Sequence, residues 1–165
     1  MEPYTVAFIG HRYIDDFRNT EHRLDEIVAK LIMEKEYVCF YVGRNGDFDQ
    51  LASSSVLRVR KRLRNDNSVL IWAVPYVTEE LNQHYDEYLS YYNEIVFFDD
   101  LAGCHPKAAI QKRNRLMIDR ADFVIAYVKR ETGGAYQSLK YAERAGKTIV
   151  NIAKLDCFTG GAIWN

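Results

Sequence analysis

The chain has few of the residues that build disulfide-bonded or metal-centred folds. Its three cysteines, Cys39, Cys104 and Cys157, are spread over 165 residues and form no Cys-x-x-Cys pair. An odd number of widely separated cysteines argues against both a disulfide framework and a zinc knuckle. The histidines also lack the spacing of metal ligands, so the sequence predicts no bound metal.

The chain also lacks bulk charge and long hydrophobic runs. A formal net charge of −1 gives no overall attraction to nucleic acid or to a membrane, so such binding would need a local patch. No basic-then-apolar leader precedes the first apolar run, and no apolar run approaches the roughly 18 residues that a membrane span needs. We therefore expect a cytoplasmic protein without membrane contact.

The composition, by contrast, is that of an ordered globular chain. Hydrophobic residues make up 48% of the sequence and charged residues 27%. We find no internal repeat, low-complexity tract or linker at which a second domain could begin. Residues 1–165 are therefore expected to form a single domain, although the last dozen residues match no element of it.

Six apolar, β-branched runs alternate with segments of helical spacing. The runs are 5–9, 37–42, 68–74, 94–98, 123–128 and 148–152. Helices are expected from about Thr20, which can cap the first one, then from Asp47, within 78–92, from Pro106 to about Arg120, and after Gly133. This alternation predicts a three-layer α/β fold: an open, mostly parallel sheet of about six strands with helices on both faces.

Parallel strands place their strand-to-helix turns along one edge of the sheet, and ligands of open α/β sheets bind there, where the strand order reverses. Four turns are expected at this edge: 10–12, 43–49, 99–100 and 129–134. The last contains Gly133 and Gly134, which open a helix directly after a buried strand. Backbone N–H groups and the positive helix end at such a turn can hold an anion.

Cationic side chains in the same turns favour a phosphate-bearing ligand. They are His11, Arg12, Arg44, Lys129 and Arg130. The Gly-x-Gly-x-x-Gly fingerprint is missing after the first strand, which argues against ordinary dinucleotide redox chemistry.

Polar residues on two helices add candidates for the same pocket. Asn114 lies on the apolar face of its helix, so it either bonds internally or reaches the pocket. Arg113 and Arg115 point elsewhere on the helical wheel, so at most one of them is expected to join Asn114. Asp47 and Asp49 open the second helix. There they either stabilise the helix N-terminus, bond to ribose hydroxyls or act as a general base.

Two further patterns have structural explanations and functional alternatives. The basic run 58–64 suits a helix C-terminus at the opposite edge, but it is also a candidate footprint for single-stranded nucleic acid. Tyr85, Tyr88 and Tyr92 share a helical face. We interpret them as packing or a dimer contact in a possible homo-oligomer rather than as a base-stacking box.

Three segments together resemble YpsA-like proteins. They are Val-Ala-Phe-Ile-Gly-His-Arg at 6–12, Gly-Arg-Asn-Gly-Asp-Phe-Asp-Gln-Leu-Ala at 43–52, and Arg-Asn-Arg-Leu-Met-Ile-Asp-Arg-Ala-Asp at 113–122 with Gly-Gly-Ala-Tyr-Gln-Ser-Leu at 133–139. That family belongs to the SLOG superfamily of Rossmann-like domains, which includes LOG phosphoribohydrolases and the single-strand-DNA-binding protein DprA. The resemblance covers nearly the whole chain and implies a nucleotide-like ligand more firmly than a reaction.

The chain departs from the LOG pattern at the catalytic position. LOG enzymes carry Pro-Gly-Gly-x-Gly-Thr-x-x-Glu, and laying this pattern on 132–140 keeps Gly133 and Gly134 but places Lys140 at the glutamate. A lysine cannot stabilise an oxocarbenium-like state. The resemblance therefore implies binding without glycosidic cleavage, unless Asp47, Asp49 or Glu143 supplies the carboxylate.

The sequence thus predicts a binding protein or ligand sensor for a nucleotide or nucleotide derivative, with no further cofactor. The alternatives are a nucleoside monophosphate N-glycosidase and a DprA-like binder of single-stranded nucleic acid. The expected ligand-binding residues are Gly10, His11, Arg12, Gly43, Arg44, Asn45, Gly46, Asp47, Asp49, Asn114, Gly133, Gly134, Ala135 and Gln137.

Overall fold

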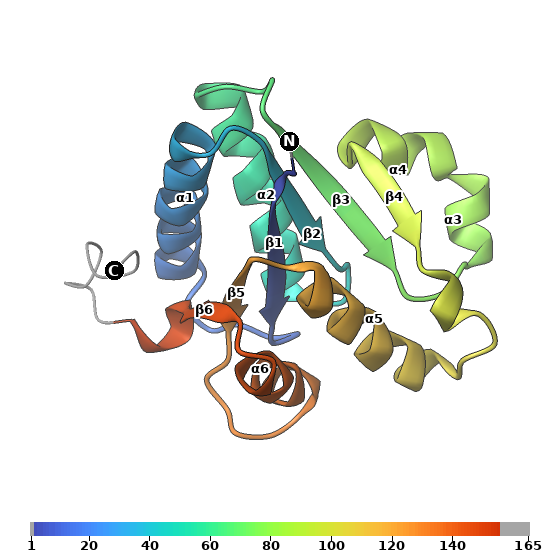
Figure 1. Cartoon of the computed structure of the whole chain (residues 1–165). Helices are drawn as coiled ribbons and strands as arrows, with labels where there is room; N and C mark the ends of the chain where they lie inside the picture. Colours follow the sequence, from blue (N-terminus) through green and yellow to red (C-terminus); the bar gives the residue numbers. More distant parts are fainter. Residues whose placement is uncertain (1, 156–165) are drawn as a thin grey trace.

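A computed structural model describes residues 2–155, in which six strands form one parallel sheet (Figure 1). The strands are β1 (Tyr4–Gly10), β2 (Val38–Val42), β3 (Ser68–Val74), β4 (Glu94–Phe97), β5 (Phe123–Tyr127) and β6 (Thr148–Asn151). Their order is β4-β3-β2-β1-β5-β6, and every neighbouring pair is parallel. The order reverses between β1 and β5.

Helices cover both faces of this sheet, which confirms the expected three-layer α/β fold. They are α1 (Phe17–Glu34), α2 (Asp47–Arg62), α3 (Glu79–Gln83), α4 (Tyr85–Tyr91), α5 (Pro106–Arg120) and α6 (Gly134–Arg144). Side chains of α1 to α4 join the core on one face, and those of α5 and α6 join the core on the other. The one short helix expected within 78–92 is a pair of helices that meet at His84.

The expected start of the first helix at about Thr20 is wrong. Helix α1 begins at Phe17, and the backbone N–H of Thr20 donates to the carbonyl oxygen of Asp16 at 3.1 Å within the first turn. Thr20 is 2% exposed, so its short side chain is buried inside the structure instead of capping a helix end.

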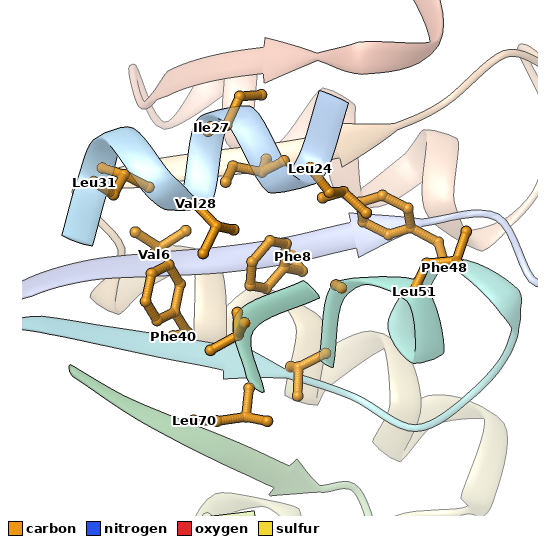
Figure 2. Close-up of a cluster of buried hydrophobic side chains, with 14 of the residues drawn as sticks. Val6, Phe8, Leu24, Ile27, Val28, Leu31, Phe40, Phe48, Leu51 and Leu70 are labelled. Carbon is orange, nitrogen blue, oxygen red and sulfur yellow. The ribbon is translucent and has the colours of Figure 1, made fainter. Parts of the chain in front are cut away.

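The core between the sheet and helices α1 and α2 anchors the turns that lead into the site. The Phe8 ring stacks on Phe40 with centroids 5.9 Å apart and meets the edge of Phe48 at 6.3 Å. In Figure 2 these rings lie against Leu24 and Val28 of α1. Because Phe48 is the second residue of α2, burying its ring fixes the start of that helix against the end of β1.

This packing leaves no room for a side chain at Gly10. A Cβ atom there would lie 2.3 Å from two carbons of the Phe48 ring, and Phe48 is fully buried. We expect Gly10→Ala to lower the free energy of unfolding, measured in urea, by about 1–3 kcal/mol. The double variant Gly10→Ala/Phe48→Leu should lose less than the sum of the two single changes. Strict additivity would contradict this assignment of the strain.

The structure also bears on membrane crossing, on the cysteines and on the C-terminal residues. Among residues 2–155, no helix has both the length and the apolar character required to cross a membrane. Cys39 and Cys104 are free thiols. Cys157 and the other residues of 156–165, which the sequence did not assign to an element, lie outside the described residues.

Candidate functional site

A cavity of about 380 Å³ opens at the carboxyl ends of β1 and β5, where the strand order reverses. Helix α5 and the turns that follow β1, β2 and β5 enclose it. Its lining consists of Phe8, Ile9, Gly10, His11, Arg12, Asn45, Asp49, Ile110, Gln111, Arg113, Asn114, Arg130, Thr132, Gly133, Gly134 and Ala135. Nine of the expected ligand-binding residues are therefore brought together: Gly10, His11, Arg12, Asn45, Asp49, Asn114, Gly133, Gly134 and Ala135.

The N-terminus of α6 forms one wall of this cavity. Gly133 occupies the N-cap position with φ 90°, a left-handed conformation that favours glycine. The N-cap residue makes no side-chain hydrogen bond to this helix, and its first turn contains no acidic residue. The partial positive charge of the helix end therefore faces the cavity without a carboxylate from its own first turn.

His11 holds the loop that leads into α6. Its Nε2 atom accepts hydrogen bonds from the backbone N–H groups of Lys129 at 2.8 Å and Arg130 at 3.1 Å. This pattern assigns a neutral ring with its proton on Nδ1. Burial and the nearby Arg130 charge lower the pKa of His11. The sequence-based expectation of a cationic donor at this position is wrong, because the ring acts as a buried acceptor.

A lowered histidine pKa makes the stability of the fold depend on pH. As the pH falls below 6.5, the unfolded chain takes up a proton at His11 before the native protein does, so the free energy of unfolding should decrease. In His11→Gln the Oε1 atom can still accept an N–H, but the side chain does not titrate. Urea titrations between pH 7 and pH 5 should show a shallower decrease for the variant. Equal decreases would contradict this role of His11.

Arg113 lies beneath the cavity and is only 1% exposed. It donates from Nε to Asn114 Oδ1 at 2.9 Å, from Nη1 to the carbonyl oxygen of Ala73 at 2.7 Å, and from Nη2 to Asn45 Oδ1 at 2.7 Å. All three acceptors are neutral. Burial lowers the pKa of Arg113, and the charge of Asp49 opposes this effect. Arg113 is thus the neighbouring arginine that joins Asn114, in keeping with the expectation that at most one of the two does.

The two asparagines that accept hydrogen bonds from Arg113 connect it to neighbouring elements. Asn114 also donates from Nδ2 to Ser138 Oγ of α6 at 3.3 Å. Asn114 thus satisfies both expectations from the sequence, because it is bonded internally and also lines the cavity. Asn45 donates its backbone N–H to Asp49 Oδ2 at 2.9 Å.

Asp49 is the acidic residue that lines the cavity, and its side chain is half-buried. Burial raises the pKa of Asp49, while the charge of Arg113 and the N–H of Asn45 act in the opposite direction. Gly43 makes this close grouping possible. A Cβ at Gly43 would lie 2.8 Å from Arg113 Nη2 and 2.9 Å from Asp49 Oδ2.

The structure does not bring five of the expected residues to this cavity: Gly43, Arg44, Gly46, Asp47 and Gln137. The Asp47 carboxylate accepts the backbone N–H of Ile14 at 3.1 Å and so closes the turn after β1. The Arg44 guanidinium lies over the ring of Tyr88, 5.0 Å from its centroid. Gln137 is exposed on α6.

Glu143, the remaining acidic candidate, also lies outside the cavity lining. It forms an ion pair with Lys140 at 3.2 Å on the surface of α6. Of the three carboxylates that could act on a bound ligand, Asp49 is therefore the one that the structure places at the cavity.

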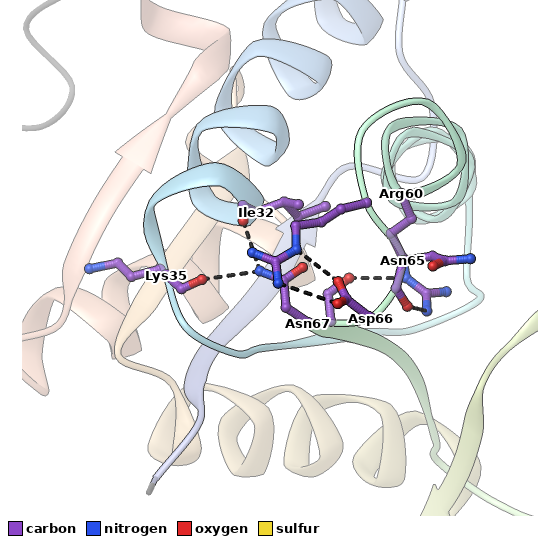
Figure 3. Close-up of polar contacts among 8 residues, drawn as sticks. Ile32, Lys35, Arg60, Asn65, Asp66 and Asn67 are labelled. Atoms are coloured by element: carbon purple, nitrogen blue, oxygen red, sulfur yellow. Dashed lines mark hydrogen bonds and ion pairs between the residues drawn. The ribbon is translucent and has the colours of Figure 1, made fainter.

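The basic run 58–64 lies at the opposite edge of the sheet and is largely engaged within the chain. Arg60 donates to Ser68 Oγ at 3.0 Å and to the carbonyl oxygen of Asn65 at 3.1 Å (Figure 3). Arg58 pairs with Asp25 at 2.6 Å, and Arg64 pairs with Asp66 at 2.7 Å. These contacts fasten the end of α2 and leave fewer cations for a nucleic-acid backbone.

Solved structures share this fold at low sequence identity. DNA processing protein A (DprA) from Streptococcus pneumoniae has a TM-score of 0.66 and 15% identity over 96% of this chain and 53% of its own. DprA from Helicobacter pylori, whose structure is described for its single-stranded DNA binding mode, has a TM-score of 0.62 and 19% identity. The match covers 89% of this chain and 64% of that protein. The molybdenum cofactor carrier protein of Chlamydomonas reinhardtii has a TM-score of 0.57 and 10% identity, and the match covers 91% of this chain and 76% of that protein.

These likenesses show the fold, a Rossmann-like α/β domain. The chain spans about half to two thirds of the length of the two DprA proteins. No family model and no curated protein matches the sequence. Membership of the SLOG superfamily, and of the YpsA-like family within it, therefore stays a prediction.

Proposed function

We propose that the cavity binds a nucleotide or a nucleotide derivative, with its phosphate at the N-terminus of α6, and that the chain acts as a ligand sensor. The observation that carries this proposal is the combination of a helix N-terminus, without a side-chain cap, and a buried arginine in one cavity. Both features favour an anion, and they come from different elements.

The charges around the cavity support an anionic ligand. Among residues 2–155, three arginines line it, Arg12, Arg113 and Arg130, against one carboxylate, that of Asp49. Arg113 is the most informative of the three because its charge is buried among neutral acceptors. A buried cation is costly to desolvate, and a bound phosphate would offset part of that cost.

The size and the polar groups of the cavity suit the remainder of a nucleotide. Small-molecule sites typically enclose about 300–1,000 Å³, and this cavity encloses about 380 Å³. Asn45, Asn114 and Asp49 offer amide and carboxylate groups for sugar hydroxyls or base edges.

Thermal unfolding in the presence of a ligand panel tests the proposal. The panel contains mononucleotides, dinucleotides, cyclic nucleotides and inorganic phosphate, each at millimolar concentration. A nucleotide present at about 100 times its dissociation constant should add roughly 2.7 kcal/mol to the free energy of unfolding and raise the melting temperature by several degrees. The proposal fails if no nucleotide raises the melting temperature.

A second candidate function is hydrolysis of the N-glycosidic bond of a nucleoside monophosphate. The observation that favours it is Asp49, a cavity carboxylate whose raised pKa suits a general acid or base. Purified protein incubated with AMP or dAMP should then release free base, and Asp49→Asn should abolish the release. Product formation that persists in Asp49→Asn would reject Asp49 as the catalytic carboxylate. If the wild-type protein releases no base, hydrolysis is rejected and the binding function stands alone.

A further inference from the structure

A second hollow of about 530 Å³ lies beside the cavity and shares Asp49 with it. The turn after β2, with Gly43, Arg44 and Asp47, lines one side of the hollow. The end of α4, with Tyr88 and Tyr91, lines the other. Asp49 is the residue common to both linings, so a ligand that occupies both spaces must pass this carboxylate.

The α4 side of the hollow is a fixed aromatic wall. Tyr88 and Tyr92 pack on the Trp72 ring with centroids 5.1 and 5.2 Å away, and Tyr91 meets Tyr92 edge-on at 4.8 Å. Tyr92 is 2% exposed, whereas Tyr91 is 38% exposed. The buried rings therefore hold an exposed ring at the hollow. Aromatic surfaces of this kind are those on which nucleic-acid bases stack.

The charges in the two spaces have opposite signs. In the cavity, Arg12, Arg113 and Arg130 outnumber Asp49. In the hollow, Asp47, Asp49 and Glu87 outnumber Arg44. A second phosphate would be repelled from the hollow, whereas a ring that carries hydrogen-bond donors would be attracted to its carboxylates.

We propose that the hollow binds the base of the same ligand whose phosphate lies at α6, and that it selects an aromatic base bearing an exocyclic amine, as adenine and guanine do. The proposal rests on the proposed function, because it needs the phosphate in the cavity. The base stacks on Tyr91, and its amine donates to a carboxylate of the hollow. Asp49, between the two spaces, accepts hydrogen bonds from the sugar hydroxyls.

This proposal uses a different tyrosine from those that the sequence singled out. Tyr85 does not line the hollow, whereas Tyr91, which the helical pattern did not single out, does. Tyr88 and Tyr92 pack on Trp72, as expected for structural residues, and Tyr88 also donates its hydroxyl to Glu80 Oε1 at 2.9 Å. The packing interpretation and the stacking proposal thus apply to different rings of one cluster.

Calorimetric titration of AMP and of ribose 5-phosphate into the wild-type protein, Tyr91→Ala and Tyr85→Ala tests the proposal. Tyr85, 45% exposed on the same helix, is the matched control. Tyr91→Ala should weaken AMP binding about 5- to 100-fold, as loss of one stacking ring does, and leave ribose 5-phosphate binding unchanged. Tyr91→Phe should retain AMP binding, and Tyr85→Ala should change neither ligand.

Three outcomes would overturn the proposal. Unchanged AMP affinity in Tyr91→Ala would mean that the hollow holds no base. An equal loss of affinity for AMP and for ribose 5-phosphate would mean that Tyr91 affects binding of the phosphate and not of the base. A shift in oligomeric state in Tyr91→Ala, seen by light scattering while AMP affinity is retained, would make the wall a contact between copies of the chain. Failure of the wild-type protein to bind either ligand would instead reject the proposed function.

Discussion

Replacing Gly134 with aspartate is expected to abolish the rise in melting temperature caused by a nucleotide while leaving the free protein stable. The new carboxylate would sit at the first residue of α6, within the lining of the cavity. At about 4 Å from a phosphate it would repel the phosphate by up to about 4 kcal/mol at an effective dielectric constant near 20. A loss of affinity of at least roughly 100-fold should follow, measured by calorimetry.

The free protein should tolerate this change, which makes the loss of binding interpretable. An acidic residue in the first turn of a helix interacts favourably with the helix dipole. A Cβ at Gly134 would meet only the end of the flexible Gln111 side chain, at 2.3 Å from Nε2. Gly134→Asn is the matched control because it has nearly the same volume without the charge. Similar losses of affinity in both variants would point to steric blockage and contradict the proposed anion site.

The sheet could be predicted from the sequence because each strand carries a strong local signal. Strand β3 is buried at every position, and residues 68–74 accordingly form an unbroken run of mostly apolar residues ending before a proline. The reversal of strand order and its place beside β1 do not follow from any single segment. They depend on the helices α5 and α6 packing on the opposite face from α1 to α4, which is a tertiary preference.

The glycine pair and its helix were also predictable, since Gly133 needs a positive φ and follows a buried strand. Which of the other candidate residues line the cavity could not be predicted. Asp47 and Asp49 are two positions apart at the start of α2, so their side chains point in different directions. One closes the turn after β1, and the other lines the cavity. Sequence spacing alone could not tell which acid faces which space.

The sequence could not show that Arg113 is the arginine that joins Asn114, because a helical wheel scores both Arg113 and Arg115 as surface residues. Arg115 follows that rule, being exposed with its guanidinium over the Tyr141 ring at 5.3 Å. Arg113 instead reaches oxygens contributed by β3, the turn after β2 and its own helix. The available signal was Asn114 itself, because a polar residue on an apolar helix face requires a partner nearby.

Replacing Arg113 with methionine is expected to produce the largest loss of stability among single changes at the site. Methionine fills much of the volume but donates no hydrogen bond. The change leaves Ala73 O, Asn45 Oδ1 and Asn114 Oδ1 without their present donor, and a buried acceptor without a partner costs about 1–3 kcal/mol. Removal of a desolvated charge offsets part of this loss.

The net decrease in the free energy of unfolding should be about 2–4 kcal/mol, which lowers the melting temperature by roughly 5–15 °C for a chain of this size. Arg115→Met is the matched control, two residues away on α5 and exposed, and it should change stability by less than about 1 kcal/mol. If both variants unfold at the wild-type temperature, Arg113 does not hold the turns together. If Arg113→Met loses stability as expected but binds nucleotide with wild-type affinity, Arg113 positions Asn45 and Asn114 without attracting the phosphate, and the attraction must come from Arg12, Arg130 and the end of α6.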